Sequence, residues 1–186
     1  MSVNKKSSNL VIISGPSGSG KTSICNELTK NPKVKQSISY TTRKPRNDET
    51  DGVDYCFVEK SEFEKLIKED KFIEHAEYCG HLYGTPIGPI REVADANRIF
   101  LLAIDVKGAM QVMKKRPDAV YIFINAPDDE TLKQRLSSRL TEDNEIINKR
   151  FMAAKEEMEA GKYYDYCVIN DRLDETVKEI EGILQI

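Results

Sequence analysis

Eight residues near the start of the chain have the types and spacing of a phosphate-binding loop. The segment GPSGSGKT at 15–22 matches G-x-x-x-x-G-K-[ST] and directly follows an apolar run. Glycines let successive backbone N–H groups curl around phosphate oxygens, and a following helix adds its partial positive charge. Lys21 can then reach the β- and γ-phosphates of a nucleotide, and the Thr22 hydroxyl can ligate Mg²⁺. A purely structural glycine-rich turn is the alternative.

Basic residues gather in a second short segment, ISYTTRKPR at 38–46. Two arginines three positions apart, Arg43 and Arg46, could hold a dianionic phosphate through charge-assisted hydrogen bonds. A solvated surface turn and a patch for nucleic acid fit the same segment. The net charge of −3 argues against a general electrostatic grip on nucleic acid or an anionic membrane. Any basic function must therefore be local.

A third group of cations lies further along, where Arg135, Arg139 and Arg150 bracket a polar segment at 140–144. Arg135 and Arg139 are four residues apart and so share one helix face. Converging guanidinium groups could stabilise the negative charge of a phosphoryl-transfer transition state. A solvated helix face is the alternative.

The composition indicates one soluble globular domain. The chain has 186 residues, of which 39% are hydrophobic and 32% charged. Its cysteines lie far apart without metal-ligand spacing, which predicts free thiols: Cys25, Cys56, Cys79 and Cys167. The start of the chain is polar, and the apolar run behind it is too short for a membrane span or signal sequence, so we expect a cytoplasmic protein.

Strand and helix patterns alternate over most of the chain. Apolar β-branched runs that predict buried strands lie at 10–14, 99–105, 120–125 and 166–170. Helical patterns separate them, so we expect an α/β fold with a parallel sheet flanked by helices.

The middle of the chain has a different pattern. Short alternating segments at 37–41, 55–58, 72–78 and 81–85 predict antiparallel strands. Ser61 and Glu64 have the spacing of a capping box that would open a helix ending near Asp70. Residues from about 36 to 87 therefore form a small mixed α+β insertion, and we expect two lobes around a cleft.

Taken together, several segments resemble the guanylate kinase family, a group of P-loop nucleoside-monophosphate kinases. They are the loop at 15–22, SISYTTRKPR with Tyr55 behind it, FIEHAEY, YGTP, IDVKGA, and RLSSR followed by NKR. The resemblance runs from about residue 9 to the end. It implies ATP-dependent phosphorylation of GMP to GDP with Mg²⁺, in one domain. The implied parts are a core (about 9–35, 88–134 and 151–186), a GMP-binding lobe (about 36–87) and a helical lid (about 135–150).

The resemblance also implies roles for individual residues. The catalytic ones would be Lys21, Arg46, Arg139 and Arg150. ATP would contact Gly15, Pro16, Ser17, Gly18, Ser19, Gly20, Lys21, Thr22, Arg135, Arg139, Asn170 and Asp171. GMP would contact Ser39, Arg43, Arg46, Tyr55, Glu74, Tyr83, Gly84, Thr85 and Asp105. Mg²⁺ would bind Thr22 with the nucleotide phosphates, and Asp105 is either a second metal contact, a nucleotide contact or an ordinary strand-terminal cap.

The chemistry of guanine agrees with the role implied for Glu74. A carboxylate can accept from guanine N1–H and N2–H₂ together, whereas adenine presents an acceptor at N1. AMP would leave the carboxylate facing a lone pair, which is a large penalty.

Two rival functions stay open at this point. Guanylate-kinase-like domains of scaffold proteins bind phosphopeptides without chemistry, and related P-loop kinases act on sugar phosphates. A GTPase is disfavoured because no N-K-x-D tetrapeptide occurs. Expected partners are GMP or dGMP and ATP, with neither nucleic acid nor membrane, in a monomer or homo-oligomer. Three residues depart from the family pattern and put rates in question: Ala103, Lys107 and Leu140.

Overall fold

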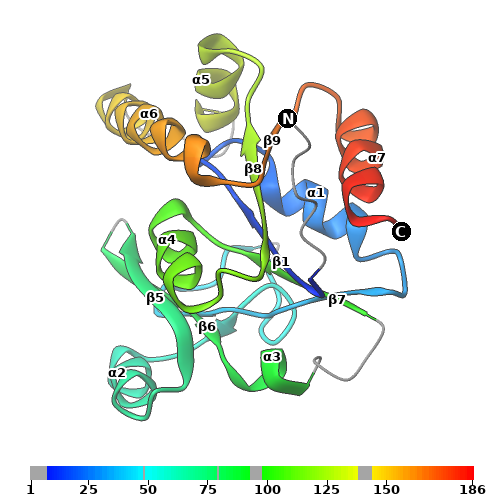
Figure 1. Cartoon of the computed structure of the whole chain (residues 1–186). Helices are drawn as coiled ribbons and strands as arrows, with labels where there is room; N and C mark the ends of the chain where they lie inside the picture. Colours follow the sequence, from blue (N-terminus) through cyan, green and yellow to red (C-terminus); the bar gives the residue numbers. More distant parts are fainter. Residues whose placement is uncertain (1–7, 48, 79, 93–97, 138–143) are drawn as a thin grey trace.

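A parallel sheet forms the centre of the chain (Figure 1). The computed structural model describes residues 8–47, 49–78, 80–92, 98–137 and 144–186. The strands of this sheet lie in the order β2-β7-β1-β8-β9. They are β1 (Leu10–Ser14), β2 (Val34–Gln36), β7 (Ile99–Ala103), β8 (Val120–Asn125) and β9 (Tyr166–Ile169).

Helices cover both faces of this sheet because its strands are apolar on both sides. Alternate residues of β1 serve the two faces. Val11 and Ile13 pack in the core that contains α1 (Lys21–Leu28) and contacts α7 (Leu173–Leu184). Leu10 and Ile12 pack in the core that contains residues of α3 (Gly88–Glu92) and α4 (Val106–Lys115). Figure 1 shows α1 and α7 on one side of the sheet and α4 on the other.

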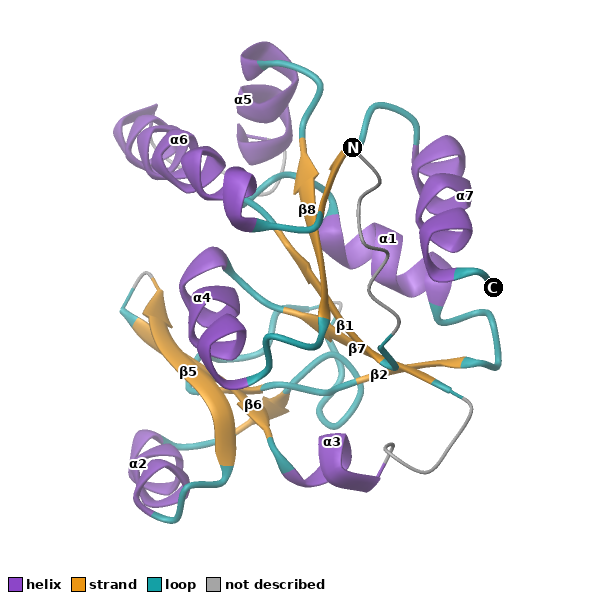
Figure 2. Cartoon of the chain, viewed as in Figure 1, coloured by secondary structure: helices purple, strands orange, loops and turns teal. Residues whose placement is uncertain are grey.

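A second, smaller sheet has the order β4-β3-β6-β5 (Figure 2). Its strands are β3 (Tyr40–Thr41), β4 (Cys56–Phe57), β5 (Phe72–Tyr78) and β6 (His81–Pro86), and α2 (Lys60–Lys68) packs against it. The rings of Phe63 in α2 and Phe72 in β5 stack with centroids 4.7 Å apart. Ile73 of β5 belongs to the α4-side core of the parallel sheet, so the two sheets share one hydrophobic layer.

A third cluster joins the helices that follow β8. They are α5 (Asp129–Ser137) and α6 (Asn144–Met158), and a 3₁₀-helix, η2 (Glu159–Tyr163), continues from α6 toward β9. Leu132 and Leu136 of α5 pack on Phe151 and Ala154 of α6.

The predicted α/β fold with a parallel sheet is confirmed, and each of the four predicted buried runs contains a strand of that sheet.

The structure differs from the sequence-based expectations at three places. The strand β2 was not predicted, because three residues are too few for a periodicity. The segment at 55–58 was expected to be antiparallel, but β4 pairs in parallel with β3. The helix expected to open at a capping box has Glu59 at its N-cap, without a side-chain cap.

Candidate active site

The phosphate loop connects β1 to α1 as the sequence predicts, and its glycines are required by close contacts. Gly15 has φ 145°, and a Cβ there would lie 2.2 Å from the Ile124 backbone oxygen. Gly20 is the N-cap of α1 in the left-handed region, with φ 93°. A larger residue at either position would force the loop to move. The first turn of α1 contains no acidic residue, so its N–H groups favour an anion.

The ammonium of Lys21 is held inside this loop. Lys21 Nζ donates to the backbone oxygens of Gly15, at 2.6 Å, and Pro16, at 2.9 Å. These bonds fix the cation against the loop, which is where a nucleotide phosphate would need it.

Asn170, at the end of β9, braces the loop from the side. Asn170 is 5% exposed, and its Nδ2 donates to the backbone oxygen of Ser19 at 2.8 Å. Its Oδ1 accepts from the Thr176 hydroxyl at 3.3 Å. The Asn170 side chain therefore contacts the loop itself, which the sequence did not indicate.

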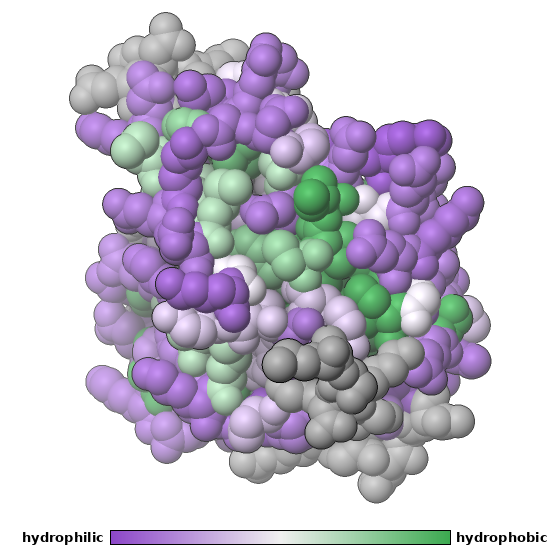
Figure 3. Space-filling model, turned by 45° about the horizontal axis from the view of Figure 1, so that its top comes forward, coloured by the Kyte–Doolittle hydropathy of each residue, from purple (hydrophilic) through white to green (hydrophobic). Residues whose placement is uncertain are grey.

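A cavity of about 320 Å³ opens beside this brace. Its lining consists of Gly18, Gly20, Ser23, Arg135, Asn170, Asp171 and Leu173. Arg135 was expected at the ATP phosphates, and in the structure its Nη1 donates to the Asn170 backbone oxygen at 2.9 Å. In Figure 3, hydrophobic residues gather in the middle of a face that is otherwise largely hydrophilic. Leu173, 36% exposed, gives the cavity one apolar wall. Such a wall beside polar backbone suits a flat base.

The predicted acceptor-phosphate residues lie together on the second sheet and its loop. The Arg43 guanidinium lies 5.6 Å from the centre of the Tyr55 ring. Its pKa is raised by Glu49 and, to a smaller extent, by the nearby Tyr83. The two tyrosine rings are 6.0 Å apart. Burial raises the pKa of Tyr55, so its hydroxyl stays protonated and can donate to a phosphate. Lys44, from the same basic segment, is exposed.

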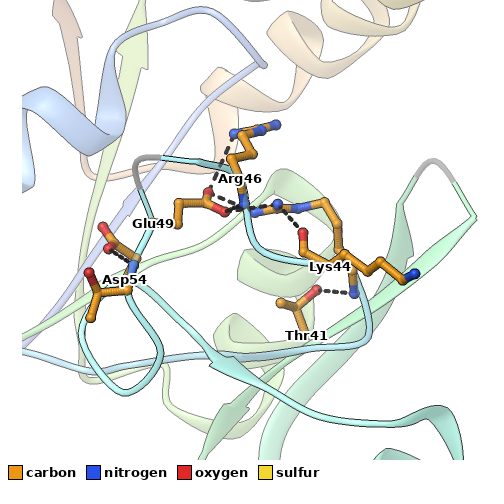
Figure 4. A network of polar contacts seen from close by, with 7 residues as sticks. Thr41, Lys44, Arg46, Glu49 and Asp54 are labelled. Atoms are coloured by element: carbon orange, nitrogen blue, oxygen red, sulfur yellow. Dashed lines mark hydrogen bonds and ion pairs between the residues drawn. The ribbon is translucent and has the colours of Figure 1, made fainter.

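Glu49 is a member of this cluster that the sequence analysis missed. Its carboxylate accepts from Arg43 Nη1 and Nη2, at 2.9 and 2.8 Å, and from the Arg46 backbone N–H at 2.8 Å (Figure 4). The side chains of Arg43 and Glu49 are only 14% and 11% exposed, whereas that of Arg46 is 54% exposed. Glu49 thus binds the Arg43 guanidinium with two hydrogen bonds and also pairs with the Arg46 guanidinium at 3.5 Å, although the Arg46 side chain stays more exposed.

The three residues expected to recognise guanine are connected by close contacts between their side chains, with Glu74 and Thr85 buried and Ser39 half-buried. The Thr85 hydroxyl donates to Glu74 Oε1 at 2.5 Å and lies 3.3 Å from the Ser39 hydroxyl. Glu74 is 4% exposed, so it is not the solvated strand residue that its sequence context would suggest. Burial, with a smaller contribution from Asp105, raises the pKa of Glu74 to about 7, although the Thr85 hydrogen bond lowers it.

Gly84 has a packing role beside these three residues. It pairs with Tyr40 and His75 in the sheet, and a Cβ there would lie 2.9 Å from the Phe63 ring.

Two carboxylates lie between the loop and the second sheet. Asp105 Oδ1 accepts from the Gly108 N–H at 2.7 Å and caps α4, so the strand-terminal cap is confirmed. Glu157 of α6 was not predicted, because its spacing is that of an ordinary charged helix face. Burial raises the pKa of Glu157, and the nearby Lys21 ammonium and Ser17 backbone N–H lower it. Asp105 acts on both Glu157 and Glu74, which places it between the two sites.

The predicted lid arginines are only partly accounted for. Arg139 and Leu140 lie outside the described residues, and Arg150 is half-buried on α6. Their catalytic roles stay predictions. Of the other departures, Ala103 ends β7 and Lys107 is exposed in the first turn of α4.

No helix among the described residues is long and apolar enough to cross a bilayer. In the same ranges, no three His, Cys, Asp or Glu side chains gather as a metal site.

A family model of guanylate kinase matches residues 7–186. The chain belongs to the guanylate kinase family. The guanylate kinase of Carboxydothermus hydrogenoformans is 45% identical over 176 residues, covering 94% of this chain and 86% of that protein. That of Clostridium perfringens (strain 13 / Type A) is 46% identical over 94% of this chain and 82% of that protein. The crystal structure of guanylate kinase from Anaplasma phagocytophilum has a TM-score of 0.81 and 33% identity, covering 99% and 88% of the two chains.

Removing the brace on the loop should weaken ATP binding in this guanylate kinase family member. Asn170→Ala leaves the Ser19 carbonyl, in a fully buried residue, without its donor, which costs roughly 1–3 kcal/mol. We expect the KM for ATP to rise about tenfold, on the scale of one lost hydrogen bond, because the loop would no longer be held in the conformation that suits phosphate. The KM for GMP should not change. Steady-state kinetics with each substrate varied measures this. Arg172→Ala is the control, because that exposed side chain makes only surface ion pairs. An equal rise of KM for ATP and for GMP would contradict the assignment of Asn170 to the ATP site.

The raised pKa of Glu74 predicts a pH dependence of GMP binding. Only the carboxylate can accept both guanine N–H groups, so protonation competes with GMP. Because the pKa is about 7, affinity should be constant above pH 8 and fall as the pH drops through 7. At pH 6 the KM for GMP should be about tenfold higher. The GMP phosphate itself titrates near pH 6, so Glu74→Gln is measured alongside. A wild-type profile identical to that of the variant would contradict the prediction.

Proposed function

We propose that the chain transfers the γ-phosphoryl group of ATP to the phosphate of GMP, giving ADP and GDP. One observation carries the proposal: the chain combines a phosphate loop at the end of β1 in the parallel sheet with a second sheet that carries both a cationic cradle and a buried carboxylate. The first part suits a nucleoside triphosphate, and the second suits a guanine monophosphate. Membership of the guanylate kinase family supports the same reaction.

ATP would bind with its phosphates on residues 15–22 and its base in the cavity beside Asn170 and Asp171. Lys21 would contact the β- and γ-phosphates, and Arg139 and Arg150 would stabilise charge on the transferred group. Arg135 would act from the wall of the cavity, where it holds the Asn170 backbone.

GMP would bind on the second sheet. Arg43, Arg46, Tyr55 and Tyr83 would hold its phosphate, and Ser39, Glu74 and Thr85 its base. Both guanidiniums pair with Glu49, Arg43 through two hydrogen bonds and Arg46 through one longer contact of 3.5 Å. We therefore assign Arg43 the orienting role, and assign direct neutralisation of phosphate to the more exposed and less tightly held Arg46.

The reaction would then need no general base. A GMP phosphate oxygen attacks the γ-phosphorus in line, and the bond from that phosphorus to the β,γ-bridging oxygen breaks. The electron pair leaves with ADP. Closure of the site would exclude water, which is the competing acceptor.

Mg²⁺ would reach this site together with ATP. The exposed Thr22 hydroxyl opens α1, and Asp105 uses Oδ1 for its cap, so Oδ2 could take a metal-bound water. A hydroxyl, one carboxylate and substrate phosphates are a suitable set for Mg²⁺, which keeps several waters. When bound, the ion neutralises charge on the β- and γ-phosphates. We also propose a cytoplasmic location.

Acceptor selectivity and the loop lysine test the reaction together. A coupled assay of ADP release compares GMP, dGMP, AMP and a sugar phosphate as acceptors. We expect turnover with GMP, and a Lys21→Ala variant that loses roughly three orders of magnitude in kcat. That variant should keep its affinity for GMP, because the two sites are separate. Turnover with only the sugar phosphate would support a sugar-phosphate kinase. No turnover with any of the four acceptors would support a binding module without catalysis.

The assignment of Glu74 has its own test. Glu74→Gln replaces one acceptor oxygen by an NH₂ group that opposes the guanine donors. We expect the ratio of kcat/KM for GMP to that for AMP to fall at least about a hundredfold. The KM for ATP is the internal control. An unchanged ratio would remove Glu74 from guanine recognition without affecting the proposed reaction.

A further inference from the structure

Helix α4 contacts β5 immediately on both sides of Glu74. The side-chain amide of Gln111 forms two hydrogen bonds with the backbone of His75. His75 N–H donates to Gln111 Oε1 at 3.3 Å, and Gln111 Nε2 donates to the His75 oxygen at 2.7 Å. Because β5 is an edge strand, Gln111 takes the place of a neighbouring strand at this residue.

Lys115 makes the matching contact on the other side. Its Nζ donates to the backbone oxygen of Ile73. The backbone before Glu74 and the backbone after it are thus both fixed by side chains one turn apart on α4.

Gly108 completes this face of the helix. A Cβ at Gly108 would lie 2.5 Å from Glu74 Oε2 and 3.0 Å from its Cδ. Residues 108, 111 and 115 follow the i, i+3, i+7 spacing of one helical stripe. The glycine leaves the space that the carboxylate occupies against the start of α4.

The strand pairing is irregular immediately before Glu74, which itself pairs with Thr85. The pairing of β5 with β6 shifts between Phe72 and Glu74, as at a β-bulge. A bulge re-aims the side chains beside it, so the direction of Glu74 depends on additional contacts. The stripe on α4 supplies them. Moreover, α4 is anchored in the core through Ala109 and Val112, which pack with Ile12 of β1.

We propose that Gly108, Gln111 and Lys115 are positioning residues that determine the choice of base by fixing Glu74 relative to the core. This inference rests on the proposed role of Glu74. In this arrangement, base selectivity depends on a helix of the parallel-sheet core that acts through Glu74.

The test compares Gln111→Ala and Lys115→Ala with Lys114→Ala, a change of the neighbouring exposed lysine. We expect kcat/KM for GMP to fall roughly tenfold in each of the first two variants, on the scale of a lost hydrogen bond. The GMP-to-AMP ratio should fall with it. The KM for ATP should stay constant, and Lys114→Ala should match the wild type. Thermal unfolding verifies that all variants are folded.

A pH profile separates positioning from general weakening. Lys115→Ala removes a cation that favours the carboxylate form, so the pH midpoint of the GMP KM should rise, and Lys115→Arg should restore it. Gln111→Glu keeps the acceptor for His75 N–H but loses the donor, and should be intermediate. The inference would be overturned if folded Gln111 and Lys115 variants kept the wild-type GMP-to-AMP ratio and the wild-type pH midpoint of the GMP KM, while Glu74→Gln still lowered that ratio. An unchanged ratio in Glu74→Gln would overturn the role of Glu74 and the inference together.

Discussion

Two negatively charged phosphates have to approach each other in this reaction. Their electrostatic repulsion is the main constraint on the site, and locally placed cations offset it. The chain has a net charge of −3, so its cations act locally. Lys21 is bound to carbonyls of its own loop, Arg43 to Glu49, and Arg135 to the Asn170 backbone. Each guanidinium or ammonium is thereby held in place before substrate arrives. Such preorganisation reduces the rearrangement needed when negative charge enters the site.

The same site contains a charge that works against folding. The folded pKa of Glu74, about 7, lies above the ordinary value of 4.5. Stability from this group is therefore fully present below about pH 4.5 and is lost as the pH rises through 7. Above that, the buried carboxylate costs on the order of 3 kcal/mol. A glutamine would avoid this cost but could not accept two hydrogen bonds from guanine. Burial of the Glu74 carboxylate away from water destabilises the fold. The same burial makes it energetically costly to bind a base that leaves the carboxylate without hydrogen-bond donors.

The sequence could predict features whose residues are adjacent in the chain, and it could not predict contacts between residues far apart in the chain. The loop at 15–22, its preceding strand and its following helix are contiguous, so their pattern identified them. Glu49 could not be assigned, because an acidic residue after a basic loop fits solvent equally well. Glu157 and Gln111 contact residues 140 and 36 positions away, at Ser17 and His75. Their partners are fixed only by tertiary packing, which periodicity does not encode.

The shared hydrophobic layer explains how two separate recognition sites can act on one reaction. Ile73 precedes Glu74 in β5 and packs with Ile12 of β1, the strand that leads into the phosphate loop. The strand that carries Glu74 is therefore packed on the sheet that carries the phosphate loop. Any motion that separated β5 from α4 would break the Gln111 and Lys115 contacts and release Glu74. The loop around Arg46 is held separately, by Glu49, which accepts from the Arg46 backbone N–H and pairs with the Arg46 guanidinium. The positions proposed for the acceptor phosphate and for the base therefore rest on different contacts, and in-line transfer requires both groups to be in place.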